Sequence, residues 1–257
     1  MKAAAGIADC RKLHRGFTLL EILIAISIFG VIATIVYSTF NAVVSRTDVI
    51  KEEAAVSEMA ATCLNRITMD LKAMYVEQYP LYKPADYDDE PDPYRFEAEL
   101  DYTGSKQFPR LSFASGEHLP MSGDRRDLSA DNKTMRPGLA RIRYHVDKGQ
   151  NSDPDSDQGH SLKRGDRPFP YDDSGPEDND PEKDPVLCRN ITELEFTYLD
   201  SQGDWHETWD SESENIDYAT PRAVKIALKI STGGREHRFS TSIDLPVYRE
   251  PLERVEQ

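Results

Sequence analysis

The most restrictive feature of the sequence is an apolar segment near its N-terminus. Residues 17–37 read FTLLEILIAISIFGVIATIVY, and no charged residue lies between Glu21 and Arg46. An α-helix of about 20 such residues spans the hydrocarbon core of a bilayer. We therefore expect a membrane-spanning helix over residues 17–37, with the rest of the chain folding outside the membrane.

The residues that precede this segment indicate its orientation. Residues 1–16 carry four basic side chains and one acidic side chain, and positive charge holds the adjacent end of a membrane helix in the cytoplasm. The C-terminal bulk is then expected on the opposite side, which for a bacterial inner membrane is the periplasm. A secretory signal peptide would have a shorter apolar stretch followed by a small-residue cleavage site, which this sequence lacks.

The junction between these two parts carries a specific motif. Residues 15–21 read RGFTLLE, which resembles the prepilin processing motif of type IV pilins and of the pseudopilins of type II secretion. The resemblance implies that a membrane-embedded prepilin peptidase cuts between Gly16 and Phe17 and methylates the new N-terminal Phe17. Gly16 has no side chain, so the backbone can enter a narrow active site in an extended form.

Glu21 is the one acidic residue inside the apolar segment. An ionised and unpaired carboxylate in a membrane costs at least a few kcal/mol, so Glu21 is a candidate functional residue. The resemblance implies that Glu21 pairs with the free amine of Phe17 in a neighbouring subunit and thereby sets the axial register of a filament. An ordinary membrane anchor with an interfacial Glu is the plainer alternative.

The helix is expected to continue beyond the membrane, because the first proline is Pro80. Apolar and small residues recur at steps of three and four over residues 38–79, which predicts an amphipathic helix. A coiled coil could use such a stripe, but Ala and Ser suit the close approach of a sheet better. The stripe comprises Val43, Thr47, Ile50, Ala54, Ser57, Ala61, Leu64, Ile67, Leu71 and Tyr75.

Alternating apolar residues predict antiparallel strands in the remainder, residues 80–257. One helix followed by such strands is an α+β pattern, which together with the N-terminal motif resembles the pilin fold. The expected strands cover residues 96–102, 111–113, 140–146 and 194–198, with a hairpin of 224–230 and 239–245 across 231–234.

Residues 147–185 differ in composition from these strands. They contain 12 acidic residues, 5 basic residues and 6 prolines, so we expect a mobile acidic surface insertion. Asp153, Asp155 and Asp157 resemble half of a calcium-binding loop, but the sixth and twelfth positions of that spacing are Gln158 and Arg164. A solvated loop is the preferred interpretation, with weak calcium binding as the alternative.

Other candidate chemistry is sparse. The formal charge of −15 opposes binding to nucleic acid. Residues 206–210, HETWD, begin like a zinc-protease helix but lack its second His, so we expect no enzymatic activity and no cofactor. Cys10 lies in the leader; Cys63 and Cys188 could form a disulfide on the oxidising side of the membrane, or stay as two buried thiols.

The C-terminal segments carry a second resemblance. LARIRYHVD, the strand and turn from LEFTYLD to the two tryptophans, and TPRAVKIALKI look like the minor pseudopilin of the J class of type II secretion. The matching residues are Tyr144, Tyr198, Leu199, Asp200, Gly203, Trp205, Trp209, Pro221, Ala223 and Val224.

This resemblance implies a structural subunit at the tip of the pseudopilus. Such a subunit is held in the inner membrane, has I-class and K-class minor pseudopilins as partners, and helps to initiate assembly for the export of folded proteins across the outer membrane. A minor pilin of a type IV pilus is the alternative. Another is a pilus-tip adhesin or ligand-binding module, which would use Trp205 and Trp209 for stacking.

Overall fold

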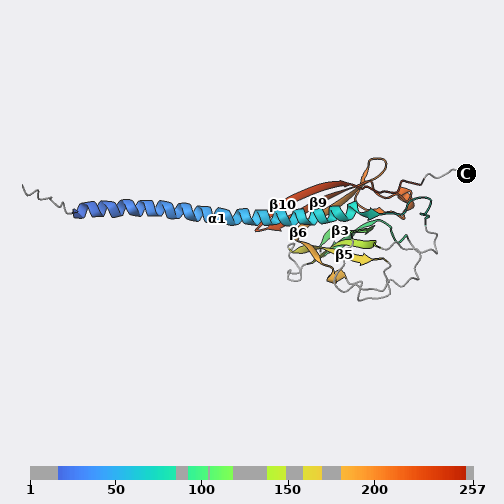
Figure 1. The fold of residues 1–257 in the computed structure, drawn as a ribbon, viewed down its shortest axis with the longest axis horizontal. Helices are drawn as coiled ribbons and strands as arrows, with labels where there is room; N and C mark the ends of the chain where they lie inside the picture. Colours follow the sequence, from blue (N-terminus) through green and yellow to red (C-terminus); the bar gives the residue numbers. More distant parts are fainter. Residues whose placement is uncertain are drawn as a thin grey trace, which may run out of the picture. The chain divides into compact units, whose positions relative to one another are not determined.

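The computed structural model consists of one long helix and an antiparallel sheet, and the chain divides into two compact units, Met1–Glu53 and Ala54–Gln257 (Figure 1). Helix α1 (Leu19–Lys72) contributes residues to both units. The structure describes residues 17–84, 92–103, 105–117, 138–148, 159–169 and 181–252.

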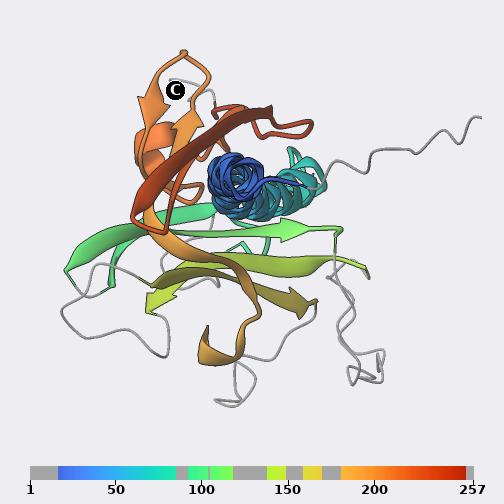
Figure 2. The same cartoon turned by 90° about the vertical axis from the view of Figure 1, so that its left-hand side faces the viewer.

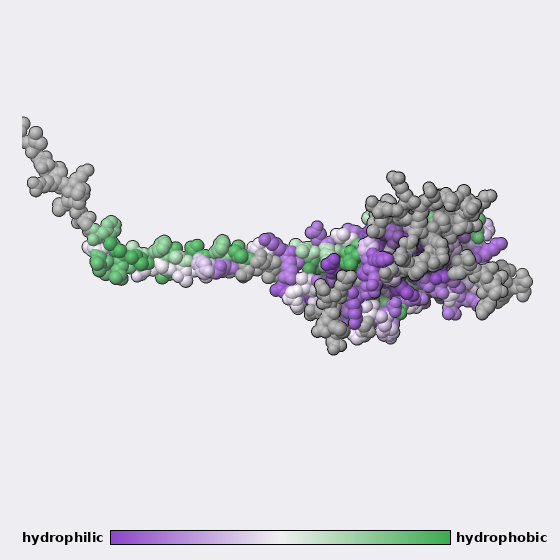
Figure 3. Space-filling model, turned by 90° about the horizontal axis from the view of Figure 1, so that it is seen from below, coloured by the Kyte–Doolittle hydropathy of each residue, from purple (hydrophilic) through white to green (hydrophobic). Residues whose placement is uncertain are grey.

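The described part of the first unit is the apolar portion of α1. Its residues Leu19–Val44 have a mean hydropathy of 2.7 and no buried side chains, so by length and composition this portion can cross a membrane. Figure 3 shows hydrophobic side chains gathered along it. The expected apolar helix is thus present, and its apolar stretch is longer than residues 17–37.

Hydroxyl side chains within this apolar portion donate hydrogen bonds to backbone carbonyls of the same helix. Ser27 donates to the carbonyl of Leu23, and Thr34 donates to the carbonyl of Gly30, each at 2.8 Å. Such bonds remove the cost of an unpaired hydroxyl in hydrocarbon. The polar residues therefore do not contradict a membrane location for this helix.

The second unit contains a ten-stranded antiparallel sheet among the described residues, in the order β10-β9-β6-β5-β4-β3-β2-β8, with β1 beside β3 and β7 beside β6. Two short 3₁₀ helices, η1 (Pro181–Lys183) and η2 (Glu214–Ile216), lie between strands. The strands are β1 (Met74–Tyr75), β2 (Glu97–Thr103), β3 (Lys106–Ser115), β4 (Ala140–Lys148), β5 (His160–Pro168), β6 (Val186–Leu199), β7 (Trp205–His206), β8 (Trp209–Asp210), β9 (Ala223–Thr232) and β10 (Arg235–Asp244).

The sheet of the second unit curls around the part of α1 that belongs to that unit, so that β9 and β10 lie on one side of the helix and β3 on another (Figure 2). Helix and sheet share one hydrophobic core. The helix contributes Val56, Ala60, Cys63, Ile67 and Leu71, all at most 3% exposed. Small Ala60 and Cys63 let the strands approach the helix backbone closely.

The α+β pilin-like fold predicted from the sequence is confirmed, including the last hairpin. Strands β9 and β10 pair from Ala223 with Asp244 to Thr232 with Arg235. The two connecting residues, Gly233 and Gly234, have φ angles of 58° and 76°. Both central residues of a type I′ turn need positive φ, which explains the Gly pair.

Two expectations about the helix were wrong. It ends at Lys72 instead of continuing to residue 79, because Met74–Tyr75 pairs with β3 as strand β1. The predicted stripe is confirmed at Ile67 and Leu71, which are fully buried, but it is wrong in the preceding turns, where Ala54, Ser57 and Ala61 are exposed. The buried face includes Asp70, a charged position that a search for apolar residues passes over.

The expectation of an insertion without core structure over residues 147–185 was also wrong. Its described residues 159–169 contain β5, which lies between β4 and β6 in the sheet. Lys163 and Arg164 are buried in this strand, at 8% and 6% exposure. The cations of this polar strand can be buried because they pair with carboxylates of the fold. Composition alone therefore predicted a surface insertion where a strand of the sheet is found.

Candidate functional site

The first turn of α1 holds two of the predicted site residues. Thr18 precedes the helix, and its Oγ1 accepts a hydrogen bond from the backbone N–H of Glu21 at 3.3 Å. Thr18 followed three residues later by Glu21 is the sequence of a capping box, which satisfies free N–H groups at a helix start. Phe17 is 77% exposed and Glu21 is exposed, whereas Gly16 lies outside the described residues.

Glu21 also has a favourable position along the helix. A negative charge in the first turn interacts well with the positive end of the helix dipole. The same turn therefore stabilises a carboxylate next to Phe17, the predicted mature N-terminus. The geometry can offer an acceptor to a cationic amine from outside the chain.

In the second unit, Asp70 of α1 is the centre of a buried ionic network that the sequence analysis missed. Its side chain is fully buried, and Arg164 of β5 donates to it from Nε at 2.7 Å and from Nη2 at 3.2 Å. Arg66 lies one helical turn earlier, with Nη2 2.7 Å from Asp70 Oδ1. The hydroxyl of Tyr144 in β4 donates a short hydrogen bond to Asp70, and Arg164 also binds Asp166 at 2.7 Å.

The titration of these groups follows from burial and charge. Burial opposes the charged form of Arg164, but hydrogen bonds to Asp70 and Asp166 outweigh burial and raise its pKa. Burial, together with the Asp70 charge, raises the pKa of Tyr144 well above its ordinary value. Arg164 therefore stays charged and Tyr144 stays neutral, and their contacts with Asp70 fix the helix to β4 and β5.

A second buried cation, Arg249, joins the beginning and the end of the part of the second unit that follows residue 79, which we call the head. Its guanidinium donates to the carbonyls of Tyr218 at 2.7 Å and Ser211 at 2.8 Å, and lies 3.2 Å from Asp92 Oδ2. It also stacks on the ring of Tyr82, 3.3 Å from the ring centroid. Arg249 therefore connects the segment after α1 with the segment after β10.

Cys63 and Cys188 come from distant parts of the sequence and meet in the core. They are 0% and 1% exposed, and both are unbonded thiols in this structure. The hydrogen bond between them, together with burial, raises the pKa of Cys63, and the same bond lowers the pKa of Cys188. The structure thus brings together the two cysteines that the sequence analysis named as a pair.

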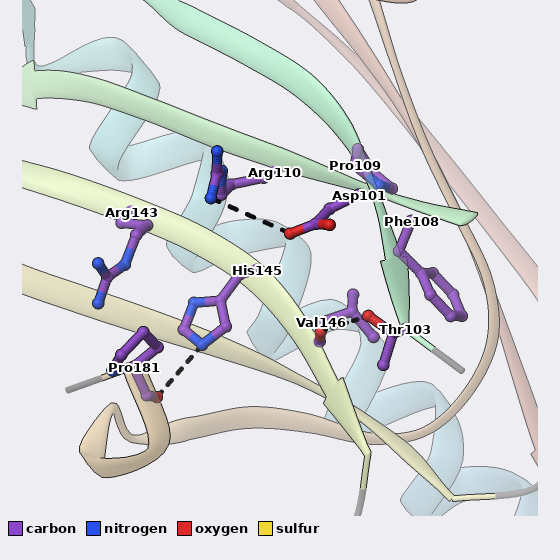
Figure 4. A pocket seen from close by; sticks show the side chains of 9 residues that line it. All are labelled: Asp101, Thr103, Phe108, Pro109, Arg110, Arg143, His145, Val146 and Pro181. Carbon is purple, nitrogen blue, oxygen red and sulfur yellow. Dashed lines mark hydrogen bonds and ion pairs between the residues drawn. The ribbon is translucent and has the colours of Figure 1, made fainter. Parts of the chain in front are cut away.

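A small pocket lies beside β4, away from these networks. Figure 4 shows that Arg143 and His145 lie on the same side as Pro181, while Arg110 and Asp101 face them. Its volume of about 120 Å³ is below the 300–1,000 Å³ that is common for small-molecule sites. Its cations already have partners, since Arg110 lies 4.0 Å from Asp101 and Arg143 binds Asp184 at 2.8 Å.

The remaining predicted residues have different outcomes. Trp209 is 4% exposed and donates from its indole N–H to the carbonyl of Ala219, whereas Trp205 is 48% exposed. The described residues contain no group of three or more His, Cys, Asp or Glu side chains that could hold a metal. The calcium candidates Asp153, Asp155 and Asp157 lie outside the described residues.

The first turn of α1, its apolar continuation and the curled sheet define a class of protein, the prepilin-type membrane-anchored subunit. The family model of the prokaryotic N-terminal methylation motif matches residues 11–37. The model of type II secretion system protein J matches residues 38–241, which is most of the chain, so the protein belongs to the J family of minor pseudopilins. A search of curated proteins found no match.

Membership of this family accounts for the main features described above. The protein has the role of a minor pseudopilin in type II secretion, and this family is structural and not known for catalysis. Membership of the family implies interaction with other pseudopilins, and the methylation motif implies processing by a prepilin peptidase. The apolar helix and the motif together point to membrane anchoring.

Proposed function

We propose that the protein is a tip subunit of the pseudopilus, with α1 in the inner membrane and the second unit in the periplasm. Its neighbours are the I-class and K-class minor pseudopilins, and its assembly with them starts the filament that exports folded proteins. The observation that carries the proposal is the match of the J-family model directly after the methylation motif. The burial of Trp209 disfavours an adhesin that would use both tryptophans.

Maturation is proposed to occur between Gly16 and Phe17. The basic leader stays in the cytoplasm, and the exposed Phe17 lies just before the first helical turn, where a peptidase can reach it. Mass spectrometry of the membrane-extracted chain tests this step. We expect an N-terminal N-methylphenylalanine, and a chain that keeps its leader would contradict the proposal.

Glu21 is proposed to bind the N-terminal amine of the adjacent subunit. In hydrocarbon such a pair removes the cost of an isolated carboxylate and sets the axial register between the helices. We expect Glu21→Ala to insert and to be processed normally but to abolish secretion. Glu52→Ala, which changes another exposed carboxylate of α1 beyond the apolar portion, is the matched control and should secrete normally.

Equal secretion by the Glu21→Ala and wild-type proteins would refute the register role. If Glu21→Ala protein failed to enter the membrane, insertion rather than assembly would be the function of this residue. Protease accessibility of the head in spheroplasts separates these outcomes, because only an inserted chain exposes its head there. The same measurement tests the proposed periplasmic orientation.

The face of α1 opposite the sheet is the proposed contact with neighbouring subunits. Met69 is 50% exposed on this face, although Ile67 two residues earlier is fully buried. A photo-cross-linking amino acid at Met69 should capture an I-class or K-class subunit in cells that secrete. The control is the same probe at Tyr102 of β2, which is 72% exposed. Capture from Tyr102 alone would place the contact on the sheet instead.

A further inference from the structure

We propose that Cys63 and Cys188 form a disulfide in the mature protein, which ties α1 covalently to strand β6. The inference rests on the proposed location of the head in the periplasm, where disulfides form and persist. Both side chains belong to the same buried cluster, and each thiol is near enough to the other to shift its pKa.

The elements that carry the two cysteines hold them in place. Cys63 lies one helical turn before Ile67, on the face of α1 that packs against the sheet. Cys188 lies in β6, opposite Leu162 of β5. The register between β5 and β6 shifts on both sides of this pair, but Cys63 and Cys188 both belong to secondary-structure elements of the core, so the pairing does not depend on a loop that can move away.

The pairing is also unambiguous. The chain has three cysteines, and Cys10 is removed with the leader if cleavage follows Gly16. The mature chain then carries two cysteines, which can form one intramolecular bond. An unpaired surface thiol, which would risk bonds between chains, is avoided because both residues are buried.

The chemistry is thiol–disulfide exchange with a thioredoxin-like thiol oxidase in its disulfide form. One cysteine thiolate attacks the oxidase disulfide to give a mixed disulfide, and the second thiolate then displaces the oxidase as a dithiol. The chain loses two protons and two electrons, and the oxidase disulfide gains them. Because the folded core excludes solvent from both sulfurs, this exchange takes place before the core closes.

The bond would have a mechanical and a thermodynamic effect. Cys63 and Cys188 enclose strands β1 to β5, so a link between them constrains much of the unfolded head. It also transmits a pull on α1 directly to the sheet. A subunit drawn out of the membrane through its helix would then keep that helix seated in the sheet.

Thiol counting on the full-length chain in cells tests the proposal. Cultures are quenched with acid, denatured and alkylated with a polyethylene glycol maleimide, with and without prior reduction. Each free thiol adds one polyethylene glycol unit to the chain. The mature chain should show no added unit without reduction and two added units after reduction. In a strain without the periplasmic thiol oxidase, two units should appear without reduction.

Single-cysteine variants show that the bond joins these two residues. Without reduction, Cys63→Ala and Cys188→Ala should each gain one unit, because each has lost its partner. A precursor that keeps Cys10 gains one further unit with or without reduction, because Cys10 has no partner, so incomplete processing is visible in the same gel. The wild-type measurement is decisive even if a variant does not accumulate.

Two outcomes would overturn the inference, and they differ in what they imply for the proposed function. Two units without reduction, on a mature chain whose head is accessible to protease in spheroplasts, would refute the disulfide alone. Two units on a head that is protected in spheroplasts would refute the periplasmic location and the disulfide together.

Discussion

The buried network around Asp70 allows one prediction to be worked out quantitatively. Substitution of Asp70 by Asn keeps the shape of the side chain but removes the charge that faces Arg164 and Arg66. Arg164, whose side chain is 7% exposed, then keeps Asp166 as its one remaining carboxylate in this network. Removing one partner of a buried ion pair costs about 3–5 kcal/mol.

Such a loss is large for a domain of ordinary stability, about 5–15 kcal/mol. With a urea dependence of about 2 kcal/mol per molar, the unfolding midpoint of Asp70→Asn should fall by roughly 2 M. The measurement is urea unfolding of the mature full-length chain in a mild detergent, followed by tryptophan fluorescence. Trp209 is the reporter, because it is buried in the core of the second unit.

Asp101→Asn is the matched control. The Asp101 side chain is 65% exposed and lies 4.0 Å from Arg110, and such surface pairs contribute about 0–1 kcal/mol. The double variant Asp70→Asn with Arg164→Gln should recover part of the loss, because the buried Arg164 no longer faces a neutral residue, whereas Asp166 then loses its Arg164 partner and Arg66 still faces the neutral side chain at position 70. A midpoint for Asp70→Asn within about 0.5 M of wild type would refute the reasoning.

Three further changes test other contacts in the same unfolding assay. Tyr198 is fully buried, and its hydroxyl has no hydrogen-bond partner among the described residues, so Tyr198→Phe should raise the free energy of unfolding by about 1 kcal/mol; a loss of that size would contradict this. Burial lowers the pKa of His145 below its ordinary value of 6.5 and outweighs the opposing effect of the Asp184 charge. As the pH falls, the unfolded chain therefore takes up this proton before the folded chain does, and the free energy of unfolding should decrease below pH 6.5. His145→Gln should flatten that dependence. A Cβ on Gly165 would lie 2.6 Å from Asp184 Oδ2, so Gly165→Ala should cost about 1 kcal/mol in wild type and less in an Asp184→Ala background; equal costs would show that the clash is not the cause.

The apolar helix and the last hairpin could be predicted from sequence because their signals are local. An uncharged run of Leu, Ile and Val has one common structure, and Gly233-Gly234 between alternating apolar residues selects a tight turn. The candidate residues Phe17 and Glu21 were found for the same reason, since a short motif carries them. Each of these features depends on a few neighbouring residues.

Strand β5 could not be found in this way because its partners are far along the chain. The sequence from His160 to Pro168 has no apolar alternation, and Arg164 is buried only because Asp70 neutralises it from the helix. A weak signal existed in Asp70 itself, which lies between Ile67 and Leu71 on the buried face of α1. An acidic residue at such a position indicates a buried cation elsewhere in the fold.

Arg249 has a consequence for the order in which the second unit can fold. Its guanidinium closes contacts with Tyr82 and Asp92, which precede most of the sheet, and with Ser211, which follows β8. These groups stay partly unpaired until the residues after β10 are in place. A chain that stops before Arg249 therefore lacks the contacts that close this junction.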